Sequence, residues 1–185
     1  MRCGSVRGQK VLSLIAATSG EVIRGWTRMD LPVIRAVPLP FVAAGHGVTP
    51  IFPPDREVAA LFGRLGTAVE CSSQAEFDLL AVGSALMGSY FGLLETAQGW
   101  LVGEGLPEAL ARTYLAGLFG SLGGVAEGST KAFADLRDEY STKGGLNEQM
   151  FRVFGEEGGT PALRAALESV RQRVRGSVGE NPPRI

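Results

Sequence analysis

The stretch most informative about the fold runs from Leu136 to Gln149 and reads LRDEYSTKGGLNEQ. It places two adjacent glycines, Gly144 and Gly145, between two segments with helical patterns. Two glycines allow backbone torsions with φ > 0 and a close approach to a small anion. Because the residues from Leu146 onward open a helix, free N–H groups there would carry partial positive charge and favour a carboxylate. The alternative is a plain helix–turn–helix corner, the more common use of turn glycines.

The residues on either side of this turn predict a helical half, which we expect to span 73–176. Ser73 can cap a long helix, and Pro107 suits the first turn of the next one. Leu79–Leu94 is the longest uncharged run of the first segment. It is too short and too rich in Gly and Ser for a membrane span, so we interpret it as a buried core helix. A last helix is predicted from Thr160, with a narrow apolar stripe suited to packing against a neighbouring helix.

Residues 1–72 follow a different pattern, in which short apolar runs bounded by Gly or Pro alternate with helical segments. The predicted strands are Lys10–Ala16, Pro32–Val37, Val48–Phe52 and Thr67–Cys71, and the predicted helices are Gly20–Arg28 and Asp55–Leu65. Asp55 is expected to cap the second helix. Such alternation is typical of an α/β fold with a parallel sheet. The sequence therefore predicts an α/β part followed by an all-α part, with residues 177–185 as a disordered tail.

Composition excludes several classes of protein. The 185-residue chain is long enough to bury a core without metal or disulfide support. Eighteen basic and nineteen acidic residues are spread without long blocks of like charge, so a nucleic-acid or anionic-membrane surface is not indicated. Cys3 and Cys71 lie far apart and have no C-x-x-C partner, which argues against a disulfide framework and against a metal site. The start of the sequence lacks a secretory pattern, so we expect a cytoplasmic protein.

A second subunit is expected from the helical half. Small residues recur along its first predicted helix, including Gly83, Gly88 and Gly92. Each glycine costs the helix up to about 1 kcal/mol, which favours a close partner or ligand, although a crowded bundle core explains the pattern equally well. A few helices on a small sheet would also leave apolar faces uncovered.

Several segments, in this order, match a known family of enzymes. They are Leu12–Ala17, Val33–Pro38 with Pro40, Gly45–Thr49, Leu136–Glu139 with Ser141–Gly145, and Glu156–Gly159 with Ala165-Ala166. On these residues the chain resembles the pyrroline-5-carboxylate reductases from about Val11 to Arg175. The match at the Gly-Gly turn is the strongest.

The resemblance implies a fold and an activity. Residues 1–72 would be the C-terminal part of an NAD(P)-binding Rossmann-like domain, and residues 73–176 a helical dimerisation and substrate domain. The family reduces 1-pyrroline-5-carboxylate to L-proline in proline biosynthesis, with NADPH or NADH as hydride donor. The implied partners are a small imino-acid or amino-acid carboxylate and further copies of the chain, in a homodimer or an oligomer of dimers, with no nucleic acid or membrane.

The resemblance also implies a substrate site at the turn. The residues expected to bind the substrate carboxylate are Thr142, Lys143, Gly144, Gly145 and Leu146. Asn147 stands where the family has a threonine that hydrogen-bonds the imine nitrogen, and it is the expected catalytic residue. An amide can donate or accept a hydrogen bond, but it cannot release a proton near neutral pH. The proton would then arrive with a protonated iminium, through water or through Glu148.

Cofactor contacts are implied for residues at the ends of the first two predicted strands and directly after them. These are Ala16, Ala17, Val37, Pro38 and Leu39. Leu39 falls in a segment that is one residue shorter than in the family and lacks its asparagine. The pocket would be more apolar there, which is consistent with a changed substrate. No metal is implied.

The sequence holds no strand, Gly-x-Gly-x-x-Gly turn and helix of the kind that binds a dinucleotide pyrophosphate. The nearest match, Gly45-His46-Gly47, runs into a predicted strand and is interpreted as a turn. We therefore expect an incomplete reductase whose start is truncated or misassigned, or one that has lost its cofactor half. The alternative function is a non-catalytic module for dimerisation or for binding small carboxylates.

Overall fold

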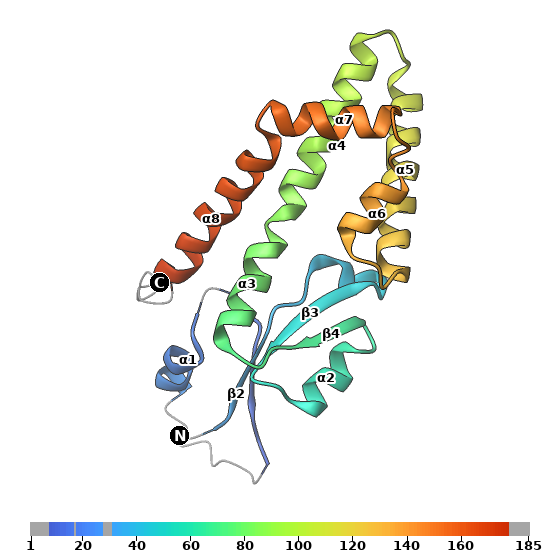
Figure 1. The fold of residues 1–185 in the computed structure, drawn as a ribbon. Helices are drawn as coiled ribbons and strands as arrows, with labels where there is room; N and C mark the ends of the chain where they lie inside the picture. The colour runs from blue at the N-terminus through green and yellow to red at the C-terminus, as the bar shows by residue number, and fades with distance from the viewer. Residues whose placement is uncertain (1–7, 17, 28–30, 178–185) are drawn as a thin grey trace. The chain divides into compact units, whose positions relative to one another are not determined.

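The computed structural model describes residues 8–16, 18–27 and 31–177 (Figure 1). The chain divides into two compact units. The first comprises Met1–Ala85 and Leu167–Ile185, and the second comprises Leu86–Ala166. The predicted domain boundary at residue 72 stays a prediction, because a compact unit and a domain in the evolutionary sense need not end at the same residue.

The first unit contains a four-stranded sheet in the order β1-β2-β3-β4. The strands are β1 (Val11–Ser13), β2 (Val33–Ala36), β3 (Gly47–Phe52) and β4 (Gly66–Glu70). β1 pairs with β2 in parallel and β3 pairs with β4 in parallel, whereas β2 and β3 are antiparallel. The predicted all-parallel sheet is therefore wrong. Only the short 3-10 helix η1 (Pro40–Ala44) lies between β2 and β3, and a parallel crossover needs a longer connection.

Three described α-helices lie wholly in this unit, namely α1 (Gly20–Thr27), α2 (Arg56–Phe62) and α3 (Gln74–Ser84), and the unit also includes the end of α8 (Gly159–Ser177). The main hydrophobic core lies between the sheet and α2, and it consists of Ile34, Ala36, Ile51, Val58 and Phe62. Side chains alternate along a strand, so Val33 and Arg35 lie on the other face of β2. Phe77 of α3 lies on that second face, because the Arg35 guanidinium stacks 4.5 Å from its ring centroid.

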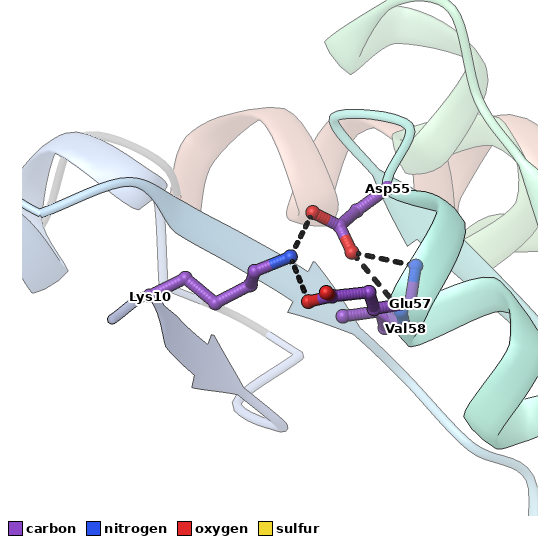
Figure 2. A network of polar contacts seen from close by, with 4 residues as sticks. All are labelled: Lys10, Asp55, Glu57 and Val58. Atoms are coloured by element: carbon purple, nitrogen blue, oxygen red, sulfur yellow. Dashed lines mark hydrogen bonds and ion pairs between the residues drawn. The ribbon is translucent and has the colours of Figure 1, made fainter. Parts of the chain in front are cut away.

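The start of α2 is fixed by a polar network (Figure 2). The Asp55 Oδ1 atom accepts hydrogen bonds from the backbone N–H groups of Glu57 at 3.1 Å and Val58 at 3.0 Å. Asp55 is thus the N-cap that the sequence predicts. Lys10 closes the network with ion pairs to Asp55 Oδ2 at 2.6 Å and to Glu57 Oε2 at 2.7 Å. These bonds join the segment before β1 to the helix that covers the core.

The second unit is helical. Its helices are α4 (Leu86–Gly103), α5 (Glu108–Gly128), α6 (Phe133–Glu139) and α7 (Leu146–Glu156), and α8 (Gly159–Ser177) begins in it. α4 and α5 pack side by side as a hairpin (Figure 1). In this unit only Ala111 and Leu115, both on α5, are buried hydrophobic residues among those the structure describes.

The long helix expected after Ser73 is interrupted at Ala85. Ser73 does cap α3, where its hydroxyl accepts a hydrogen bond from the Glu76 N–H at 3.2 Å. α4 then starts at Leu86 and contains no buried residue. The interpretation of Leu79–Leu94 as a buried core helix is therefore wrong for α4, because α5 is its main packing partner within the chain.

By length and composition, the combined segment Gln74–Gly103 is apolar enough to cross a membrane. Only 11% of its most apolar window is buried within the chain. A single helix of this kind is weak evidence for a membrane span, because the core helix of a soluble protein passes the same test of length and composition.

Candidate functional site

The Gly-Gly turn joins α6 to α7, as the sequence predicts. Gly144 has φ of 74°, a conformation that favours glycine. Gly145 is the N-cap of α7, and its N–H donates to the Thr142 carbonyl at 2.7 Å. A Cβ atom at Gly145 would lie 2.8 Å from that same carbonyl oxygen. Both glycines are therefore required by the backbone of the turn itself.

Two side chains from the first turn of α7 fold back onto this corner. The Gly144 N–H donates to Glu148 Oε2 at 2.6 Å. The Asn147 Nδ2 atom donates to the Tyr140 carbonyl at 2.7 Å, which satisfies an oxygen at the end of α6. An N–H group expected to hold a ligand carboxylate thus binds a carboxylate of the chain itself. One N–H of the Asn147 amide is thus engaged, and its second N–H and its oxygen remain to meet a ligand.

A hollow of about 600 Å³ adjoins the turn. Its lining includes Arg137, Asp138, Ser141, Lys143, Glu148, Phe151 and Arg152. Arg137 pairs with Asp138 at 2.6 Å and stacks 5.1 Å from the Phe151 ring centroid, while Arg152 pairs with Glu156 at 2.8 Å. Lys143 is the one lining cation with no ion pair among the described residues. It is the charge most available to an external anion.

The residues expected to contact a cofactor belong to the other compact unit. Ala16 follows β1, and Val37, Pro38 and Leu39 follow β2, so both groups continue from the carboxyl ends of neighbouring parallel strands. Open α/β sheets bind ligands at such ends. Ala16 is exposed and Val37–Leu39 are half-buried. Ala17 lies outside the described residues.

Arg35 is a residue that the site prediction missed. Its side chain is only 3% exposed, and its Nη2 donates to the Ala16 carbonyl at 2.9 Å. It therefore holds the loop that would meet the cofactor. The available signal was a single arginine inside the apolar run Val33–Val37. A charge at a strand centre is rarely buried unless its partners are also built into the fold.

The described part of the chain contains no group of three His, Cys, Asp or Glu side chains that could hold a metal ion. The acidic side chains near the turn are instead engaged by arginines or by backbone N–H groups.

The family model for pyrroline-5-carboxylate reductase dimerisation matches residues 77–177, which is more than half of the chain. The chain belongs to the pyrroline-5-carboxylate reductase family. Membership in this dimerisation family implies that the protein forms homo-oligomers. A search of curated proteins finds no match.

Solved structures of pyrroline-5-carboxylate reductases are similar in fold. The Coxiella burnetii structure has 19% identity and a TM-score of 0.80, and the alignment covers 92% of this chain and 66% of that one. The Plasmodium falciparum structure, which has NADP bound, has 14% identity, a TM-score of 0.78 and coverages of 91% and 70%. The Streptococcus pyogenes structure has 18% identity, a TM-score of 0.80 and coverages of 91% and 68%.

These similarities confirm the predicted fold class, a Rossmann-like part followed by a helical dimerisation domain. The chain spans about two thirds of the length of these reductases. At identities below one fifth, the comparison establishes the fold of this family member. Its chemistry has to be argued from its own residues.

Proposed function

We propose that this chain takes part in the NAD(P)H-dependent reduction of a cyclic imino acid, with 1-pyrroline-5-carboxylate and L-proline as the substrate and product. The observation that carries the proposal is the Gly-Gly turn at the start of α7, beside the unpaired Lys143, in a chain of this family. The N–H groups at a helix start and a lysine ammonium both favour a carboxylate.

In this proposal the turn Thr142–Leu146 binds and orients the substrate carboxylate. The Tyr140 carbonyl accepts one N–H of the Asn147 amide and so fixes the orientation of that amide, whose oxygen is a free acceptor for the ligand. That oxygen can accept a hydrogen bond from the N–H of a protonated imine, which orients the C=N bond and stabilises the iminium form. The iminium brings its own proton, so no residue of the turn has to supply one. Most of the rate enhancement comes from holding the reactants in line.

A nicotinamide cofactor, when bound, supplies the hydride that reduces the C=N carbon. The residues present fit its nicotinamide end, since Ala16 and Val37–Leu39 lie at the carboxyl ends of adjacent strands. Arg35 fixes the Ala16 carbonyl and so keeps this edge in place. A glycine-rich pyrophosphate loop does not occur in the sequence of residues 1–185. We place the protein in the cytoplasm, in line with a biosynthetic role.

One observation favours a second function, a non-catalytic dimerisation or carboxylate-binding module. The carboxylate of Glu148 already occupies the Gly144 N–H at 2.6 Å. If that bond persists during binding, the turn serves chiefly to close the corner between α6 and α7.

Calorimetric titration of the purified chain with L-proline, and separately with NADPH, tests these functions. We expect Gly145→Ala to weaken proline binding by about tenfold, because its Cβ meets the Thr142 carbonyl and deforms the turn. The matched control is Gly155→Ala in α7, where a Cβ meets no atom within 4 Å. Proline binding without NADPH binding supports the module, whereas binding of both supports the reductase. Equal proline affinities in the two variants would exclude the turn as the carboxylate site.

A further inference from the structure

A second cavity lies in the first compact unit, beside the start of α1. It has a volume of about 410 Å³ and lies on the face of β2 that carries Val33 and Arg35. Its polar lining residues are Ser19, Glu21, Arg24, Arg35 and Gln74. Neither the substrate turn nor the residues expected to contact the nicotinamide line this cavity.

Arg35 gives the cavity an incompletely neutralised positive charge. Its guanidinium bonds to two neutral oxygens, the Ala16 carbonyl at 2.9 Å and Gln74 Oε1 at 3.1 Å. Its Nε is buried and has no hydrogen-bond partner among the described residues. A buried charge is costly unless paired and fully hydrogen-bonded. Burial lowers the pKa of Arg35, against a smaller opposing influence of Asp78.

The carboxylate of Asp78 compensates the charge of Arg35 only indirectly, through the Gln74 side chain. Gln74 donates from Nε2 to Asp78 Oδ1 at 2.6 Å, while its Oε1 accepts from Arg35. The amide therefore separates the two charges, and the described residues contain no direct ion pair to Arg35. Stacking on Phe77 at 4.5 Å adds a cation–π contact but brings no negative charge.

The start of α1 faces the same cavity. This helix has eight residues, and the Ser19 hydroxyl accepts from the Val22 N–H at 3.3 Å. The other N–H groups of a first turn lack intrahelical acceptors and favour an anion. Arg24 lies one turn further along and adds a second guanidinium at the exposed rim. Among the described residues, Glu21 is the one carboxylate in the lining, and it is exposed.

We propose that this cavity binds a small oxyanion, a phosphate or a carboxylate, between the buried Arg35, the rim residue Arg24 and the start of α1. Guanidinium groups suit such ligands because their planar forks donate paired hydrogen bonds to two oxygens. The bound anion completes the neutralisation of Arg35. It thereby also links α1 to β2 and to the Ala16 loop that Arg35 holds.

The test is a calorimetric titration of the full chain with inorganic phosphate and with acetate, at constant ionic strength maintained by sodium chloride. We expect saturable binding that Arg24→Gln weakens about tenfold, since a hydrogen bond to a charged group is lost. Arg64→Gln, which removes an exposed arginine from the same unit but away from the cavity, should bind as the wild type does. Tighter binding of phosphate assigns a phosphate ligand. Tighter binding of acetate assigns a carboxylate, provided that Arg24→Gln weakens it and Gly145→Ala, which alters the turn of the other unit, does not.

A second variant keeps the test decisive if Arg24→Gln disturbs the fold. Arg35→Lys retains the buried charge but loses the planar fork, so anion affinity should fall while the circular dichroism spectrum stays native. Gly145→Ala, which alters the turn in the other unit, should leave phosphate binding unchanged. Absence of saturable binding in the wild type, or equal weakening in Arg24→Gln and Arg64→Gln, overturns the proposal.

Discussion

If the Gly-Gly turn binds an external carboxylate, as we propose, Glu148 competes with that carboxylate for the Gly144 N–H. Its side chain accepts the Gly144 N–H at 2.6 Å, in the place where a substrate carboxylate would bind. We predict that Glu148→Ala increases the affinity for L-proline, because the N–H group becomes free and a like charge is removed. Calorimetry measures the change. Glu157→Ala removes the same charge at the other end of α7 and should leave the affinity unchanged.

Gly66 is the glycine on which the sheet depends most directly. Its φ is 135°, and a Cβ atom there would collide with the backbone of Gly47, its register partner in β3. We predict that Gly66→Ala lowers the free energy of unfolding by about 2 kcal/mol or more, from backbone strain and this collision. Urea denaturation measures the loss. Gly83→Ala in α3, where the added Cβ meets open space, should be neutral or stabilising.

At this scale, residues with local roles could be predicted and residues with distant partners could not. The cap at Asp55 and the helix after the Gly-Gly turn depend on neighbours in sequence, and the structure contains both. The partners of Arg35 come from Ala16 and Gln74, which only the folded sheet brings together. The back-bond of Glu148 is local, yet the sequence pattern does not distinguish it from a solvated side chain. The roles of the turn residues remain predictions.

Among the elements, α2 has the clearest dependence on pH. The hydrogen bond from Lys10, followed by that from the Val58 N–H, holds the pKa of Asp55 below its usual range. A carboxylate with a lowered folded-state pKa stabilises the fold above its unfolded pKa, about 3.9, and ceases to do so as the pH falls through the folded value.

We therefore predict that Asp55→Ala lowers the free energy of unfolding at pH 7 by about 1 kcal/mol through loss of the cap. Asp55→Asn keeps a capping oxygen but loses the ion pair with Lys10, so it should be intermediate. Thermal unfolding from pH 7 to pH 3 measures both variants. The difference between wild type and Asp55→Asn should shrink below about pH 4. A constant difference would contradict the role of the Asp55 charge.

The direction of β3 shows where element-level prediction ends. Its apolar run was predicted within a residue, since Val48–Phe52 lies inside the observed Gly47–Phe52. The pairing of strands depends instead on the length of the connection and on the register. Ten residues separate Ala36 from Gly47, which favours an antiparallel return over a crossover. Because strands and helices alternate elsewhere in the first unit, the sequence pattern predicted a parallel pairing for β3 as well.

For the whole molecule, we expect the exposed apolar surface of α4 and α5 to form the interface of the oligomer. Phe91 is 60% exposed and Trp100 is 66% exposed, although both lie in an apolar helix. We predict that the purified chain forms a dimer or a larger assembly and that Phe91→Asp dissociates it. Light scattering after size-exclusion chromatography measures the mass. Leu61→Asp, on the exposed side of α2 in the other unit, should leave the mass unchanged.

The exposure of α4 in the single chain could not be predicted from its sequence. An apolar helix is expected to be buried, but its composition does not indicate whether it is buried against its own chain or against another one. The residues of α4 lie within the match to the dimerisation family, so we expect the oligomer to cover their apolar side chains. The interpretation as a buried core helix assigned the cover of α4 to the chain itself, within which α4 has no buried residue.

The bond between Glu148 and Gly144 also sets how measured affinities must be interpreted. A carboxylate tethered within the same helical turn acts as an intramolecular competitor, whose effective concentration does not change when the protein is diluted. The apparent dissociation constant of any external acid equals the intrinsic constant divided by the fraction of molecules in which the turn is open. Weak binding of an external acid to the wild-type chain would thus reflect the small fraction of molecules with an open turn, and not a high intrinsic dissociation constant of the site.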